Sequence, residues 1–338
     1  MTKPLIGITM GDPAGIGPEV TVKALQDQSV HAVSRPIVFG TVQILEDLSR
    51  LLDADLDFEA ITSLDSLDSI TTEHIPVIEC SELDPAAVKT GEVSAECGKA
   101  AADYIETAIQ AALAGQIDAT TTGPIHKKAL VKAGYPFLGH TELLANRCGV
   151  EHTAMMLATP GRGSQTAWLR VTHASAHIAF RDIIPALTGQ KLMRTIELTH
   201  KGTQSLGISA PRLALAALNP HASDGGLMGN EEQVLLEPLV KTAGDLGFDL
   251  TGPVPADTVF LRAIQGEFDA VIGLYHDQGH IPIKTYGFER AVNITLGLPI
   301  TRTSVDHGTA FDISGKLVAD PSSMIEAIKL AAEIRANA

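Results

Sequence analysis

Short apolar runs rich in Val, Ile and Leu alternate with longer Ala- and Leu-rich stretches along most of the 338-residue chain. The short runs end in Gly, Asn, Asp or Pro and predict strands, whereas the longer stretches predict helices. Strands that alternate with helices are typical of a parallel sheet in an α/β protein. The predicted strands are 5–9, 37–39, 119–121, 153–158, 167–172, 213–217, 270–274 and 292–295. The predicted helices are 18–25, 97–114, 141–148, 231–246, 258–265 and 324–336.

Two stretches depart from this alternation. Residues 53–69 are acidic, rich in Leu, Asp and Ser, and carry no candidate chemistry, so we expect a variable surface region there. Residues 159–165 combine Pro with Gly, which break regular structure and predict a hairpin tip or a loop.

The total length exceeds what one hydrophobic core usually fills, so we expect two lobes or one large α/β unit.

Charge and cysteine content restrict the partners and the compartment. The formal net charge is -15, so nucleic acid and anionic membranes would be repelled, and an anionic substrate needs a local basic pocket. Three widely separated cysteines without a C-x-x-C pair predict reduced thiols. The first apolar run, residues 5–10, is too short for a signal peptide or a membrane span. We therefore expect a soluble, cytoplasmic protein.

A glycine-rich segment, Met10 to Glu19, lies between a predicted strand and a helix that begins with Pro18. Glycines allow close approach of a ligand, and the free N–H groups at a helix start favour an anion. The segment has neither the G-x-G-x-x-G spacing nor the Gly-Lys-Ser/Thr of a phosphate loop. Its residues by themselves leave a ligand loop and a tight turn equally open.

Three histidines each follow a predicted strand: His177, His221 and His276. Ligands of open α/β sheets bind at the carboxyl ends of strands, so these imidazoles could meet in one crevice. Three neutral imidazoles suit Zn, Co or a similar divalent ion and leave coordination positions open. A single histidine is more often a satisfied polar residue, and other histidines compete for these roles: His126, His140, His173, His280 and His307.

Two further groups of polar residues are candidates for binding a ligand. The group near the C-terminus consists of Lys284, Asn293, Arg302 and Asp306, interleaved with glycines. Basic residues beside glycine-rich turns are candidates for holding a carboxylate or phosphate, although surface solvation explains them equally well. The mid-chain segment 139–142 reads as a loop entering a helix, and capping explains Thr141 and Glu142 but not His140.

Several segments together resemble the 4-hydroxythreonine-4-phosphate dehydrogenases and their relatives that act on 4-phospho-D-threonate and 4-phospho-D-erythronate. They run in order over nearly the whole chain. The matching segments are MGDPAGIGPE (10–19), TGPIHK (122–127), GHTE (139–142), NPHASDGG (219–226), PADTVF (255–260), YHDQGHIPIK (275–284) and VNITLGLPITRTSVDHGTAFDI (292–313).

This family in turn resembles the isocitrate and isopropylmalate dehydrogenases. The resemblance implies two α/β/α lobes around a central cleft, an obligate homodimer, and NAD bound without a Rossmann fingerprint. We expect the first lobe from residues 1–130 with 290–338, and the second, with the metal ligands and dimer contacts, from residues 131–289.

Carried over by motif, the resemblance implies one divalent ion (Zn, Co, Mg or Mn) held by His177, His221 and His276, at a site shared between subunits. Residues 177–181, His-Ile-Ala-Phe-Arg, fit the family pattern, so His177 is preferred to His173. The implied substrate contacts are His140, Thr141, Lys284, Asn293 and Arg302. The implied NAD contacts are Gly11, Asp12, Gly15, Gly17, Asp306 and His307.

The resemblance implies oxidation of a phosphorylated hydroxy acid followed by decarboxylation, with the metal acidifying the substrate hydroxyl. Lys284, Arg302 and His140 are expected to hold the phosphate and carboxylate. The candidate proton acceptors are Lys127, Asp257 and Asp277, and Asp277 could instead orient His276.

The substrate itself stays open at this point. His280 and the segment 311–313 look closer to the sugar-acid branch than to the hydroxythreonine branch of pyridoxine biosynthesis. A terephthalate dihydrodiol dehydrogenase is less favoured, because the basic residues expected to hold a phosphate are intact. A non-catalytic sensor of the same ligand is also less favoured, because such a protein would be expected to have lost a site residue.

Overall fold

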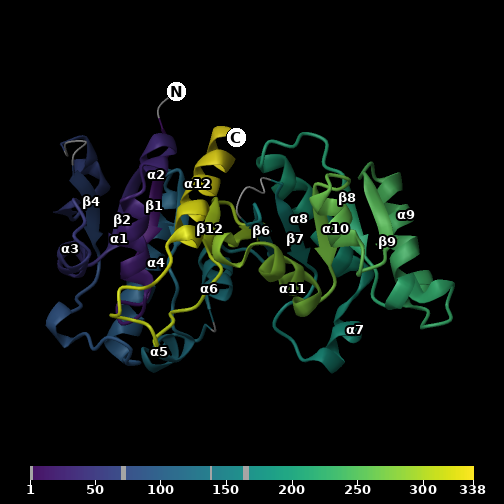
Figure 1. Cartoon of the computed structure of the whole chain (residues 1–338), viewed down its shortest axis with the longest axis horizontal. Helices are drawn as coiled ribbons and strands as arrows, with labels where there is room; N and C mark the ends of the chain where they lie inside the picture. Colours follow the sequence, from purple (N-terminus) through teal and green to yellow (C-terminus); the bar gives the residue numbers. More distant parts are fainter. Residues whose placement is uncertain (1–2, 70–73, 138, 163–166) are drawn as a thin grey trace. The chain divides into compact units, whose positions relative to one another are not determined.

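A computed structural model describes residues 3–69, 74–137, 139–162 and 167–338 (Figure 1). The chain divides into two units. The first contains residues 1–151, 298–336 and 338, and the second contains residues 152–297 and 337. Among the described residues, no helix combines the length and the apolar character that a membrane span requires.

The first unit contains a parallel sheet in the order β3-β4-β2-β1-β5-β12. Parallel strands end at the same edge, so the segments after β1, β5 and β12 leave this edge together. Those segments carry Asp12, Lys127 and Asp306. The strand bounds are β1 Leu5–Thr9, β2 Arg35–Gly40, β3 Asp57–Ile61, β4 His74–Glu79, β5 Ala119–Thr122 and β12 Arg302–Val305.

Helices of the first unit form two groups. Helix α1 contacts α2, α3 and α12, and α12 lies along β12 (Figure 1), whereas α4 contacts β1, β2, β5, α5 and α6. The core between helices and sheet includes Ile6, Ile8, Phe39 and Tyr104. The helices are α1 Gly17–Leu25, α2 Gln28–Val33, α3 Val42–Leu51, α4 Ala95–Leu113, α5 Lys127–Lys132, α6 His140–Arg147 and α12 Ser322–Ala336, with short 3-10 turns at Leu64–Ser69 and Pro85–Ala87.

The second unit contains a mixed sheet in the order β11-β6-β7-β10-β8-β9. Strand β6 pairs antiparallel with both β11 and β7, and the remaining pairs are parallel. The antiparallel pairing of β6 with β7 confirms a hairpin at the predicted loop, of which residues 163–165 lie outside the described residues. The bounds are β6 Ala154–Thr159, β7 Leu169–His173, β8 Leu213–Ala216, β9 Leu250–Val254, β10 Ala270–Gly273 and β11 Val292–Leu296.

Helices of the second unit contact its sheet through α8, α10 and α11. The core includes Leu157, Val171, Phe260 and Ile283. The helices are α7 Ile183–Ala186, α8 Gly189–Ser205, α9 Glu237–Asp245, α10 Val259–Ile264 and α11 His276–Gly287. A π-helical turn, η5, covers Glu232–Leu236, and 3-10 turns cover η3 Phe180–Asp182, η4 Pro220–Asp224 and η6 Phe288–Arg290.

The predicted α/β class is confirmed, and two details of the prediction need correction. Residues 53–69, expected as a variable surface region, are not wholly at the surface, because β3 pairs there with β4 and buries Phe58 and Ile61. The lobe bounds also differ: residues 131–151, expected in the second lobe, belong to the first unit, and residues 290–297, expected in the first lobe, belong to the second. The physical reason is that Leu143 and Leu144 of α6 pack against Ile105 of α4.

Candidate active site

The glycine-rich segment between β1 and α1 is buried from Met10 to Val20. The backbone N–H of Asp12 donates to the carbonyl of Pro124 at 2.9 Å, and that of Ile16 donates to the carbonyl of Thr309 at 3.0 Å. A Cβ at Gly17 would lie 2.3 Å from the carbonyl oxygen of Met10. The glycines therefore permit close packing of three segments. Their contact with NAD, expected for Gly11, Asp12, Gly15 and Gly17, stays a prediction.

Asp12 is a buried carboxyl group inside this segment. Only 1% of the residue is exposed, and Oδ1 accepts the Ala14 N–H at 3.0 Å. Oδ2 is buried and has no hydrogen-bond partner among the described residues. Burial raises the pKa of Asp12 to about 6, and the bond from Ala14 opposes the shift. Asp12 can therefore change its protonation state close to neutral pH.

Arg302 begins β12 and His140 begins α6, and their side chains reach Thr122 and Gly123 at the carboxyl end of β5. Arg302 is 2% exposed and donates from Nη2 to Thr122 Oγ1 at 2.5 Å. Burial lowers the pKa of Arg302 to about 9, which still leaves the guanidinium positive at neutral pH. Burial, with the nearby charge of Arg302, holds the pKa of His140 well below its ordinary value, although a bond to the Gly123 carbonyl opposes this.

The neutral His140 has a defined tautomer. Its Nε2 is buried without a partner among the described residues, so Nδ1 is the nitrogen that faces the Gly123 carbonyl. A carbonyl only accepts, so Nδ1 carries the hydrogen and Nε2 carries a lone pair. Such a nitrogen accepts a hydrogen bond from a hydroxyl and repels an anion. Within this unit, Arg302 is therefore the better group for a carboxylate or phosphate.

The remaining candidates of the first unit follow β5 and β12. Lys127 is exposed at the first position of α5, and Thr141 is half-buried at the second position of α6. The Asp306 N–H donates to Ser323 Oγ at 3.1 Å, and His307 Nδ1 lies 3.0 Å from the Gly308 carbonyl. These contacts order the segment after β12, and its contact with NAD stays a prediction.

In the second unit, α11 carries three candidate groups at intervals of four residues: His276, His280 and Lys284. This spacing places them on one helix face. The rings of His276 and His280 stack with centroids 3.6 Å apart, and the His177 ring centroid lies 5.8 Å from that of His276. Lys284 Nζ lies 4.7 Å from the centroid of the Phe288 ring. The sequence pattern did not predict a helix over these residues.

His173, the alternative metal ligand, is occupied in another contact. It is 4% exposed at the end of β7, and burial lowers its pKa to about 3. Nδ1 lies 3.3 Å from the Met155 carbonyl and Nε2 lies 3.0 Å from His280 Nδ1. The carbonyl requires a hydrogen on Nδ1 of His173, so its Nε2 accepts and His280 Nδ1 donates. These contacts favour His177 over His173 as the ligand.

His221 lies in a loop, Asn219 to Gly226, with unusual backbone angles. The φ angles of His221, Ala222, Ser223 and Asp224 are 53°, 56°, 64° and 46°. Left-handed backbone costs about 1–2 kcal/mol for each non-glycine residue. Strain of this kind persists where surrounding structure imposes it, often at functional sites. His221 is exposed on this loop.

The three predicted metal ligands can be tested for fit to a divalent ion. Among the described residues, no three His, Cys, Asp or Glu side chains converge closely enough to form a metal site. His276 Nδ1 lies 2.7 Å from Asp277 Oδ1, which leaves Nε2 as the coordinating nitrogen, as metal-bound histidines commonly show. The donor chemistry of His177 and His276 therefore fits a divalent ion. The convergence of His221 with this pair stays a prediction.

Asn293 and Asp257 complete the predicted set. Asn293 lies on β11 opposite Leu157, and its Oδ1 is buried without a partner among the described residues. Asp257 is exposed between β9 and α10. A buried amide oxygen without a partner is uncommon in native proteins, and the contact of Asn293 with substrate stays a prediction.

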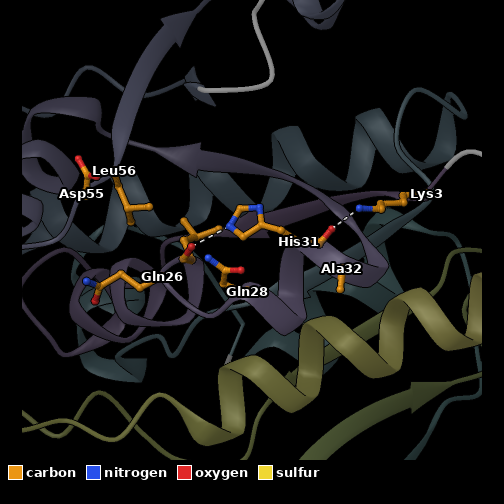
Figure 2. Close-up of a pocket in the computed structure, with 8 residues that line it drawn as sticks. Lys3, Gln26, Gln28, His31, Ala32, Asp55 and Leu56 are labelled. Atoms are coloured by element: carbon orange, nitrogen blue, oxygen red, sulfur yellow. Dashed lines mark hydrogen bonds between the residues drawn. The ribbon is translucent and has the colours of Figure 1, made fainter.

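The first unit also contains a surface hollow (Figure 2). Its volume is about 670 Å³, and its lining includes Lys3, His31 and Asp55. The polar groups bond to backbone, since Lys3 Nζ donates to the His31 carbonyl and His31 Nε2 lies 2.7 Å from the Leu25 carbonyl. None of the predicted site residues lines this hollow.

Comparison with known proteins identifies the family. The model of the family described as pyridoxal phosphate biosynthetic protein PdxA matches residues 32–331. The chain belongs to this family. The resemblance inferred from the sequence motifs is therefore confirmed.

Individual relatives cover almost the full chain. The chain is 45% identical to D-threonate 4-phosphate dehydrogenase of Cupriavidus necator, over 98% of this chain and 97% of the relative. It is 43% identical to 4-hydroxythreonine-4-phosphate dehydrogenase of Desulforapulum autotrophicum, over 98% and 95%. Among solved structures, 4-hydroxythreonine-4-phosphate dehydrogenase from Burkholderia phymatum matches with a TM-score of 0.84 and 42% identity, over 99% of both chains.

Two groups whose role depends on tertiary contacts are not among the predicted site residues. Glu232 is 0% exposed and accepts hydrogen bonds from the backbone that leads to His221. Gln278 bonds the Leu274 N–H and the Ala217 carbonyl, each at 2.7 Å, and so links the ends of β10 and β8. The only available signal was their position inside matching motifs or next to them.

Proposed function

We propose that this chain is an NAD-dependent, divalent-metal-dependent dehydrogenase that oxidises and decarboxylates 4-phospho-D-threonate or 4-phospho-D-erythronate. The observation that carries the proposal is the 45% identity, over nearly the whole of both chains, with a relative named D-threonate 4-phosphate dehydrogenase. The buried, positively charged Arg302 and the exposed histidines of the second unit supply the chemical groups such a reaction needs.

Several of the predicted residues carry groups that can bind the substrate. Arg302 supplies a guanidinium that can bind a carboxylate or phosphate through two parallel bonds. Lys284 adds a second positive charge, and Asn293 Oδ1 accepts from a substrate hydroxyl. Neutral His140 also accepts from a hydroxyl through Nε2, with Thr141 beside it on α6. Local positive charge thus compensates the acidity of the protein as a whole.

His177, His221 and His276 are the residues that would hold the metal. A bound divalent ion lowers the pKa of a coordinated hydroxyl and stabilises a developing enolate as a Lewis acid. Asp277 orients His276 through the 2.7 Å contact with Nδ1. We assign Asp277 to this task, which leaves Lys127 and Asp257 as candidates for accepting the hydroxyl proton.

The overall reaction balances as two bond-breaking steps. In the oxidation, the hydroxyl gives up its proton and the adjacent carbon gives a hydride to the nicotinamide. In the decarboxylation, the bond from the neighbouring carbon to the carboxylate breaks, CO2 leaves, and the electron pair remains as an enolate that is then protonated. The enzyme acts in the cytoplasm as a homodimer whose subunits share the metal site.

The test is NADH formation by the purified dimer, with Co2+ added or with a chelator. The substrates are 4-phospho-D-threonate, 4-phospho-D-erythronate and 4-phosphohydroxy-L-threonine. We expect turnover of at least one of the first two and its loss with chelator. No turnover of any substrate by a metal-loaded dimer would contradict the proposal.

A second candidate substrate is 4-phosphohydroxy-L-threonine. The observation that favours it is the 43% identity with a relative named 4-hydroxythreonine-4-phosphate dehydrogenase. The same assay separates the two candidates, because this substrate carries an amino group where the sugar acids carry a hydroxyl. Preference by kcat/KM decides between them.

A further inference from the structure

The loop that carries His221 is anchored by a carboxylate that no part of the proposed mechanism uses. We infer that Glu232 is a positioning residue, which fixes the backbone before His221 and thereby sets the affinity for a divalent metal. The inference rests on the metal site proposed above. Glu232 would thus act on the metal through His221, without contacting the metal itself.

Glu232 makes three hydrogen bonds to two consecutive residues. Oε1 accepts the N–H groups of Leu218 and Asn219 at 2.9 and 2.7 Å, and Oε2 accepts Asn219 Nδ2 at 2.8 Å. Each donor is an N–H group, so both oxygens act as acceptors. Asn219 Nδ2 also donates to Glu231 Oε2 at 2.8 Å. The two residues that precede Pro220 and His221 are therefore held from the side chain of η5.

The anchored backbone leads directly into the strained turn. His221 and the next three residues have left-handed φ angles, which are unfavourable for residues other than glycine. The far side of the turn is held by Ser223, which is 1% exposed and accepts the Gly226 N–H at Oγ. With both ends held, the turn keeps a backbone that sets the direction of the His221 imidazole.

The location of Glu232 supports a functional reason for this anchor. The residue is fully buried at the first position of a π-helical turn, a local irregularity often found at functional sites. A buried carboxylate is a poor device for stability alone, since apolar side chains of similar volume often stabilise more. Its advantage is that it fixes several N–H groups in defined directions.

The test measures Co2+ affinity from visible absorption of the ion and, separately, urea unfolding of the metal-free protein. Glu232→Gln keeps the size and shape of the side chain. Its amide NH2 group would face the NH2 group of Asn219, and because both are donors this hydrogen bond would be lost. We expect Co2+ affinity to fall by about 10–100-fold, as for other groups that orient metal ligands. A purely structural role would lower the unfolding midpoint and leave the affinity of the folded protein unchanged.

A matched control is Glu19→Gln in the first unit. Glu19 is also a buried carboxylate, 3% exposed, and it accepts the Ala319 N–H at 2.7 Å. We expect this variant to lose stability and to keep wild-type Co2+ affinity. If Glu19→Gln weakens Co2+ binding as much as Glu232→Gln, the inference is overturned.

A rescue variant tests the link to the strained turn. Adding Ala222→Gly to Glu232→Gln removes the conformational cost of an alanine in the left-handed region. We therefore expect the double variant to bind Co2+ up to about tenfold more tightly than Glu232→Gln alone. Glu232→Asp, too short for all three bonds, provides the same comparison if Glu232→Gln does not fold. Wild-type affinity in the folded Glu232 variant overturns the inference alone. Absence of Co2+ binding by the wild-type dimer overturns the proposed metal site and, with it, this inference.

Discussion

Asp12 and Arg302 of the first unit are buried, whereas the histidines proposed as ligands in the second unit are largely exposed. Arg302 and Asp12 are 2% and 1% exposed, and His140 has a buried Nε2, so the fold determines their contacts and charge states. His177 and His221 are exposed, so a bound ligand has more influence on their positions. The difference teaches that substitutions of the candidate residues in the two units should have different effects. Buried groups affect stability and activity together, whereas exposed groups affect activity alone.

The largest expected effect comes from an exposed histidine. His177→Ala should lower kcat at least about 1000-fold, by loss of metal-dependent chemistry, and should change unfolding free energy by less than about 0.5 kcal/mol, as for other surface substitutions. Metal content and urea unfolding measure the two effects. The paired variant His173→Ala should retain metal and lose stability, because His173 is 4% exposed. The reverse pattern of metal loss would show that His173 is the ligand.

A smaller effect is expected from Arg302→Lys in the first unit. Lysine provides one point charge, so it cannot keep the bond to Thr122 and also bind a carboxylate with two parallel bonds. We expect kcat/KM to fall about 100-fold and unfolding free energy to fall by about 1–2 kcal/mol. Arg262→Lys is the control, since Arg262 forms an exposed ion pair with Glu267. Full activity with lowered stability would remove Arg302 from the substrate site.

The smallest effect concerns Asp12 and depends on pH. Its pKa is about 6 in the folded protein and 3.8 ordinarily, so the folded state binds the proton more tightly. Ionisation of Asp12 therefore costs stability as pH rises from about 4 to about 7. Asp12→Asn should be more stable than wild type at pH 7–8, by on the order of 2 kcal/mol, with no difference near pH 4. A difference that does not vary with pH would contradict the assigned shift.

The sequence predicted the class and many elements because hydrophobic periodicity is a local property. Strand β1 begins and ends as predicted, α1 begins one residue early, and α6 differs by one residue at each end. The polar helix α8 was missed because its buried threonines interrupt the apolar pattern. Their hydroxyls donate to carbonyls four residues earlier, as Thr199 does to Thr195 at 2.6 Å, so they can lie inside.

Two other elements were missed for related reasons. Helix α11 contains Gly279 and Pro282, which ordinarily indicate a break in a helix. Gly279 is required there, because a Cβ would lie 2.3 Å from His173 Nε2. Strand β12 is polar but fully buried, since Arg302 bonds to Thr122 and Thr303 bonds to the Ala327 carbonyl. In each case a partner distant in sequence satisfies a residue that looks unfavourable locally.

For the site, the sequence by itself supplied the candidate side chains, and family resemblance grouped them. Only the tertiary structure decided that His173 is buried against His280, that His140 presents a lone pair, and that Glu232 holds the loop before His221. The physical reason is that burial and hydrogen bonding set tautomer, charge and direction, and these depend on neighbours far away in the chain. Residue type is local information, whereas the state of that residue is a property of the fold.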